Sequence, residues 1–322
     1  MRDTIGGMRT SNFDRPLLLT TGQGMAGYLA AAAGKVALFL ITCASILAVV
    51  LISVFVTREA WPFLASGGIG KLLGSANWYP TAEPPEFGAL ALLAGSLYVT
   101  AGAMIVAVPL GLGAAVFLSD IVPFRLRQLI KPVIELLAAI PSVAYGFFAV
   151  LVLAPWMQKN LGLPSGANAL NASLVLAIMT VPTIISIAED VLTAVGPELR
   201  EASYALGATR AETVIRVVMP AARSGIVGAV ILGMMRAVGE TMVVWMASGN
   251  ASQIPSPWWD LGQSLRTMTA TIAGEMGETA KGTQHYHCLF ALGFLLLVFT
   301  LILNLISEYF LAKAGRGREC HE

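Results

Sequence analysis

The chain has 322 residues, of which 56% are hydrophobic and only 12% are charged, and its mean hydropathy is +0.74. Soluble domains carry about 25% charged residues, so this composition indicates a membrane protein. It excludes a soluble secreted enzyme, a disordered chain and a disulfide scaffold. The net charge of +1 and the three scattered cysteines point to neither a nucleic-acid partner nor a metal motif.

Six stretches are apolar and long enough to cross a bilayer, which takes about 20 residues. They lie between Lys35 and Arg58, between Glu86 and Asp120, between Glu135 and Lys159, and at about 169–188, 224–247 and 288–310. The first is too long for the core of a signal peptide, and no A-x-A site follows it, so we expect it to stay uncleaved. The sequence therefore predicts an all-α polytopic membrane protein with six transmembrane helices.

The basic residues set the expected orientation of these helices. Most of the lysines and arginines outside the spans fall in the N-terminal tail, the second and fourth loops and the C-terminal tail. The positive-inside rule then places both termini in the cytoplasm. The expected domains are an N-terminal tail (1–34), a six-helix domain (35–312) with outer loops at 57–87 and 248–284, and a C-terminal tail (313–322).

Several spans carry residues that disturb or tighten helix packing. Pro109, Pro141 and Pro182 lie inside spans, where a proline removes a backbone hydrogen bond and kinks the helix. Such kinks are either simple packing irregularities or signs of helices that line a path and move. The run Gly111–Gly113 lets two helix backbones approach closely.

The fourth loop, at 189–223, is long and charged. Pro197 can begin a helix that runs to Leu206, and Gly207 suits the left-handed residue that closes it. Thr209 and Glu212 form the pattern of a capping box for a second helix, which Pro220 then ends or kinks. The loop is expected to contain two short helices that meet at a glycine.

Two functions fit such a pair of helices: a helix-turn-helix for DNA and a docking element for a soluble partner. The loop has more acidic than basic residues and is tethered at both ends to spans, which disfavours contact with phosphate backbones. We therefore expect a docking element.

Arg236 and Glu240 stand inside the fifth span, where a charged residue is costly. A spacing of four places both side chains on one helix face, so they form either a structural pair or part of a polar path. The guanidinium of Arg236 suits a phosphate oxygen. Glu240 can hold Arg236 in place, tune its charge or accept a hydrogen bond from the proton of hydrogen phosphate. Thr241 is the next residue in the chain.

The fourth loop also carries a motif: Glu201, Ala202 and Ser203, then Gly207, then Val217-Val218-Met219-Pro220. This resembles the EAA loop of ABC importer permeases, whose pattern is E-A-A, three residues, G, nine residues and I-x-L-P. Glu201, Ala202, Gly207 and Pro220 match that pattern, whereas the other three positions with a prescribed residue depart from it mildly, namely Ser203, Val217 and Met219.

Further segments narrow the resemblance to the permeases of the phosphate-specific (Pst) importer. Residues 134–146 are similar to their third span, 229–242 to their fifth, and 78–80 with 87–88 to their first outer loop. The resemblance extends over nearly everything from about 35 to 310. Of the two homologous Pst permeases, the third span and outer loop fit the PstC type better than the PstA type.

The resemblance implies a type I ABC importer permease fold in a bacterial inner membrane, with the outer loops in the periplasm. It implies transport of inorganic phosphate with a second, PstA-like permease, two ATP-binding subunits and a periplasmic phosphate-binding protein. Arg236, Glu240 and Thr241 would lie on the substrate path, and the ATPase would be coupled through a second set of residues, Glu201, Ala202, Ser203, Gly207 and Pro220.

No G-x-x-x-x-G-K-[ST] motif occurs, so we expect no ATP hydrolysis by this chain, and no catalytic residue, cofactor or metal site. Three alternatives remain. The same machine can serve another oxyanion such as molybdate or sulfate. A self-sufficient secondary transporter or channel is a second possibility, although a docking loop has no use there. A membrane enzyme is the third, and no nucleophile–base pattern supports it.

Overall fold

The computed structural model describes residues 21–319, with side chains from 32 to 310. It divides into two units, Met1–Phe55 and Val56–Glu322. The predictions for the tails at 1–20 and 320–322 lie outside the described residues.

The first predicted span lies within the long helix α1 (Thr21–Phe63). Its residues are apolar almost throughout, and a helix satisfies every backbone group of such a segment inside lipid. The part of α1 up to Phe55 belongs to the first unit, and its last turns belong to the second.

The second unit is mostly helical. Its longest helices are α3 (Leu90–Val116), α7 (Ala169–Thr193), α10 (Met219–Val238) and α13 (Gln284–Glu319). The shorter helices are α2 (Ile69–Gly74), α4 (Phe124–Ala139), α5 (Ser142–Phe148), α6 (Ala154–Leu161), α8 (Pro197–Ala205), α9 (Arg210–Thr213), α11 (Met242–Ala247) and α12 (Met268–Glu275). Four π-helical turns join or extend them: η1 (Leu64–Gly68), η2 (Phe117–Ile121), η3 (Ala149–Leu153) and η4 (Val214–Val218).

Five helices of the described chain are long and apolar enough to cross a membrane, and a bent pair of segments brings the number to six if it forms one span. The bent pair contains the predicted third span, but it begins earlier, at Phe124, within the predicted second loop. The structure breaks it between α4 and α5, with an angle of 82° between 124–139 and 142–161. The break falls at Ile140 and Pro141, because the residue before a proline is driven out of the helical conformation.

The other two prolines predicted within spans lie inside helices: α3 runs through Pro109 and α7 runs through Pro182. Of the two outcomes predicted for Pro220, an end of the helix does not occur, since Pro220 is the second residue of α10 and directly follows the π-helical turn η4. We attribute this to the wider turn, which accommodates a ring that would clash with the carbonyl four residues earlier.

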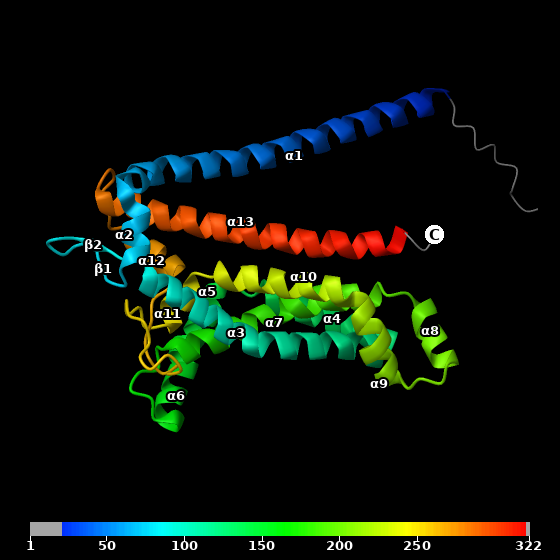
Figure 1. Ribbon diagram of the computed structural model, residues 1–322. Coiled ribbons are helices and arrows are strands. Elements are labelled where there is room, and N and C mark those ends of the chain that lie inside the picture. Colours follow the sequence, from blue (N-terminus) through cyan, green and yellow to red (C-terminus); the bar gives the residue numbers. More distant parts are fainter. Residues whose placement is uncertain (1–20, 320–322) are drawn as a thin grey trace, which may run out of the picture. The chain divides into compact units, whose positions relative to one another are not determined.

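The core of the second unit is formed by α7 packed between α3 and α10 (Figure 1). Glycines allow the close approach, since a Cβ on Gly111 would lie 2.7 Å from Ile184 Cγ2 and one on Gly233 would lie 2.6 Å from Ile184 Cγ1. Small residues at crossings are the usual means of packing helices in membranes. The expected close approach is confirmed at Gly111, whereas a Cβ on Gly113 would meet open space.

A two-stranded antiparallel pair, β1 (Trp78–Tyr79) with β2 (Glu86–Phe87), lies at the opposite end of this unit from α8 (Figure 1). The carboxylate of Glu275, at the end of α12, ties this end together. It accepts hydrogen bonds from Trp78 Nε1 at 3.1 Å and pairs with Arg266 Nη1 at 2.7 Å and His285 Nε2 at 2.8 Å. Glu275 thereby joins the end of α12 to three other segments: the residues just before α12, strand β1 and the start of α13.

Candidate functional site: the α8–α9 loop and the helix break at Glu240

Part of the EAA-like motif is exposed on the surface of helix α8. Glu201 and Ala202 are exposed, whereas Ser203 is buried. The helix ends as predicted, because Gly207 adopts a left-handed conformation with φ of +84°. Leu206, just before it, is 89% exposed, so the tip of the loop displays a large apolar side chain.

The second helix of the loop begins with the predicted capping box. Thr209 Oγ1 accepts from the backbone N–H of Glu212, and the Glu212 carboxylate accepts from the backbone N–H of Thr209 at 2.9 Å. The hydrogen bonds that this carboxylate accepts from the backbone N–H and from the hydroxyl of Thr209 lower the pKa of Glu212 below its ordinary value. The ionised carboxylate therefore holds the start of α9 in place.

Ser203, a mild departure from the EAA pattern, has a structural role here. Its hydroxyl lies 2.9 Å from the hydroxyl of Thr213 at the end of α9. Both side chains are buried, so the hydrogen bond satisfies two groups that would otherwise be costly to bury. It joins α8 to α9 across the turn at Gly207.

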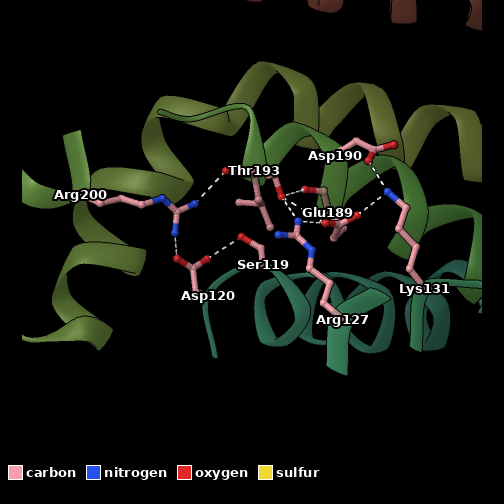
Figure 2. A network of polar contacts seen from close by, with 9 residues as sticks. Ser119, Asp120, Arg127, Lys131, Glu189, Asp190, Thr193 and Arg200 are labelled. Atoms are coloured by element: carbon pink, nitrogen blue, oxygen red, sulfur yellow. Dashed lines mark hydrogen bonds and ion pairs between the residues drawn. The ribbon is translucent and has the colours of Figure 1, made fainter. Parts of the chain in front are cut away.

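A network of charged residues surrounds the base of this loop (Figure 2). Arg200 of α8 forms an ion pair with Asp120 of η2 and donates a hydrogen bond from Nη2 to the backbone carbonyl of Leu192 in α7 at 2.9 Å. Ser119 donates to Asp120 Oδ2 at 2.7 Å. Partial burial lowers the pKa of the Arg200 guanidinium, which still stays charged at neutral pH.

The second part of the network joins α4 to α7. Arg127 and Lys131 of α4 both pair with Glu189, whose side chain is 2% exposed, and Lys131 also pairs with the exposed Asp190 at 2.5 Å. Thr193 Oγ1 donates to the backbone carbonyl of Glu189. Because α4 has no buried residue in this chain, these ion pairs are prominent among the contacts that hold its first turns.

Sequence reasoning missed the partners in this network. In the sequence, Arg127 and Lys131 counted only among the basic residues that predict the orientation. Glu189 and Asp190 counted only among the acidic residues of the fourth loop. The structure places both acids in the last turns of α7. A signal was present, since Asp120 and Glu189 each stand at the end of an apolar run where an unpaired carboxylate is costly.

The predicted pair in the fifth span is not a pair. α10 ends at Val238, so Arg236 lies in its last turn and Glu240 lies in the break before α11. The prediction of one helix face for both is wrong, because the two residues are not on a continuous helix. Among the described side chains, no carboxylate forms an ion pair with Arg236.

Two of the three residues predicted on the substrate path, Glu240 and Thr241, make hydrogen bonds within this break. Glu240 Oε1 accepts from the backbone N–H groups of Met242 at 3.2 Å and Val243 at 3.4 Å, at the start of α11. Thr241 is the residue that precedes α11, and its hydroxyl lies 3.4 Å from the carbonyl of Gly239.

Arg236 is exposed and reaches toward the other break. Its Nη2 lies 3.5 Å from the backbone carbonyl of Ala138, two residues before the bend between α4 and α5. The structure thus brings two helix breaks, at 140–141 and at 239–241, next to a guanidinium whose remaining donors have no acceptor in the described chain. Such an arrangement can bind an anion.

The comparisons with known proteins agree with this architecture. The family of binding-protein-dependent transport system inner membrane components matches residues 107–316. A probable ABC transporter permease protein, YqgH of Bacillus subtilis, is 37% identical over 83% of this chain and 87% of its own length.

Two further relatives are phosphate transport system permease proteins PstC. That of Mesorhizobium japonicum is 38% identical over 84% of this chain and 87% of the relative, and that of Haemophilus influenzae is 34% identical over 86% and 91%. The resemblance to PstC-type permeases that the sequence motifs predict is thereby confirmed.

Among solved structures, one of the inward-facing conformations of the MetNI methionine ABC transporter matches with a TM-score of 0.50 and 17% identity, covering 70% of this chain and 96% of that chain. At this identity the match concerns the fold alone, and it agrees with the predicted type I ABC importer permease fold. The chain is a multi-pass protein of the bacterial inner membrane, and it belongs to the family of binding-protein-dependent transport system inner membrane components.

Proposed function

We propose that this chain is the PstC-type permease subunit of an ATP-driven importer of inorganic phosphate. The observation that carries the proposal is the relationship to PstC proteins at 34–38% identity over more than four fifths of the chain. The proposed partners are a PstA-like second permease, two ATP-binding subunits and a periplasmic phosphate-binding protein.

The proposed orientation places both termini and the α8–α9 loop in the cytoplasm, and the β1–β2 and α12 end in the periplasm. The domain boundaries at 1–34, 35–312 and 313–322 and the periplasmic loops at 57–87 and 248–284 follow from that orientation. It is supported by the basic residues of the second and fourth loops, which lie at the same end of the second unit.

The ATPase would dock on the loop at 189–223. Glu201 and Ala202 are exposed on α8 and available to a partner, and Gly207 sets the turn that presents them. Ser203 fixes the turn from within through Thr213, and Pro220 begins the helix that leads back into the membrane. ATP hydrolysis would then take place in the partner subunits, and this chain would contribute no catalytic group.

Phosphate would pass Arg236 during alternating access. The guanidinium is not neutralised by Glu240, whose Oε1 is engaged by the start of α11, so its charge and fork of donors remain for an anion. Glu240 stays within the same break and can accept a hydrogen bond from the O–H group of hydrogen phosphate. A fully ionised sulfate has no such donor, so Arg236 and Glu240 together would favour phosphate.

Uptake of radiolabelled phosphate by cells that carry the whole importer tests the proposal. We expect uptake that needs the ATP-binding subunits and persists in excess molybdate and sulfate. Inhibition by either competitor would reassign the transported ion to another oxyanion. Uptake that continues without the ATP-binding subunits would point to a secondary transporter instead.

A further inference from the structure

One side chain links helix α8 to two of the membrane helices. Arg200 Nη1 pairs with Asp120, in the π-helical turn that extends α3, while Arg200 Nη2 donates to the Leu192 carbonyl in the last turn of α7 (Figure 2). Arginine suits this position because its planar fork addresses two acceptors at once, which a lysine ammonium does with less directional precision.

Asp120 depends on this arginine. Its side chain is 5% exposed, and its two oxygens are taken by Arg200 and by the hydroxyl of Ser119. Removing one member of a buried ion pair leaves an uncompensated charge in a poorly solvated place. The position of α8 and the position of the end of α3 are therefore energetically connected.

The two helices joined by Arg200 are tightly packed against each other. Within the described residues, α3 and α7 share the most extensive helix–helix packing, and Gly111 lies so close to Ile184 that a Cβ there would be 2.7 Å from Cγ2. Interdigitated cores of this kind transmit displacement rather than absorb it. A displacement of α8 through Arg200 would reach both spans together.

A second route from α8 exists and serves as the comparison. The hydrogen bond between Ser203 and Thr213 leads through α9 and η4 into α10. The ion pairs of Glu189, by contrast, connect α4 with α7 and do not include α8. The two links therefore leave α8 through different side chains, Arg200 toward α3 and α7 and Ser203 toward α10.

We propose that Arg200 and Asp120 are the positioning residues that convert movement of α8 into movement of the α3–α7 pair, and so couple ATP hydrolysis to opening of the path. The proposal rests on the docking role proposed above for α8. Loss of the link would leave the ATPase active while the spans no longer follow it.

The test uses the purified, fully assembled importer in lipid vesicles, with ATP hydrolysis and phosphate uptake measured on the same sample. The ratio of phosphate moved to ATP hydrolysed is expected to fall about tenfold in Arg200→Gln, within the usual range of coupling between sites. Arg125→Gln, at an exposed arginine of α4 outside the docking loop, is the matched control and is expected to keep the ratio.

Asp120→Asn tests the same link in case Arg200→Gln fails to assemble. It removes the buried charge while keeping the shape of the side chain. We expect it to lower the ratio as well, and the double variant Arg200→Gln/Asp120→Asn to fall no further than Arg200→Gln alone. An unchanged ratio in Arg200→Gln, additive losses in the double variant, or a loss confined to Ser203→Ala would overturn the proposal. Failure of the unaltered importer to move phosphate would instead overturn the proposed substrate, and the ratio can then be measured with the anion that is moved.

Discussion

Two adjacent acids at the end of α7 show how strongly burial changes the contribution of a charge. Glu189 is 2% exposed and holds Arg127 and Lys131, whereas Asp190 is 64% exposed and pairs with Lys131 alone. Buried ion pairs lose several kcal/mol when one partner is removed, while exposed pairs contribute little.

We therefore expect Glu189→Ala to lower the free energy of unfolding by about 3 kcal/mol, because two cations lose a buried partner. Asp190→Ala is the neighbouring control and should change it by less than about 1 kcal/mol. Thermal unfolding of the purified protein in detergent measures both. Equal effects of the two substitutions would show that the ion pairs of Glu189 do not hold α4 against α7.

At the scale of single elements, the turn between α8 and α9 depends on one glycine. Gly207 has a φ of +84°, and a Cβ placed on it would meet no atom within 4 Å. A substitution there is therefore costly only through the backbone conformation, by about 1–2 kcal/mol for a residue with a Cβ.

Gly196, just before α8, offers a matched control, since a Cβ there also meets nothing within 4 Å and its φ is −55°. We expect Gly207→Ala to weaken binding of the ATP-binding subunit about tenfold, and Gly196→Ala to leave it unchanged. Titration of the purified subunit against vesicles with each variant measures this. Equal binding by both variants would mean that the left-handed turn does not set the presented surface.

The sequence predicts these elements well where a local rule operates. The capping box of Thr209 and Glu212 and the left-handed Gly207 depend on neighbouring residues alone, and the structure has both. The break at 239–241 escaped prediction because no proline or glycine pair marks it decisively. It is held by Glu240 and by the hydroxyl of Thr269, which donates to the Glu240 carbonyl at 2.9 Å from far along the chain.

At the scale of the whole molecule, apolar runs predicted the spans, and length and composition still identify five helices and one bent pair. The sequence alone does not predict which charged residues form ion pairs with each other. The partners Asp120 and Arg200 are 80 positions apart and Arg127 and Glu189 are 62 apart, and only the packing of α3, α4 and α7 brings them together. The same holds for Arg236 and Ala138, each of which lies just before a different helix break.

The central claim is that this chain forms part of the path of phosphate and that Arg236 lies on it. The most direct measurement is the initial rate of ATP-driven phosphate uptake by vesicles that contain the whole importer, comparing Arg236→Gln with Arg125→Gln, at an exposed arginine outside the break and the docking loop. Loss of one charge-assisted contact of about 1.5–3 kcal/mol predicts a rate at least about tenfold lower for Arg236→Gln and an unchanged rate for Arg125→Gln. Equal rates for Arg236→Gln and the unaltered importer would contradict the account.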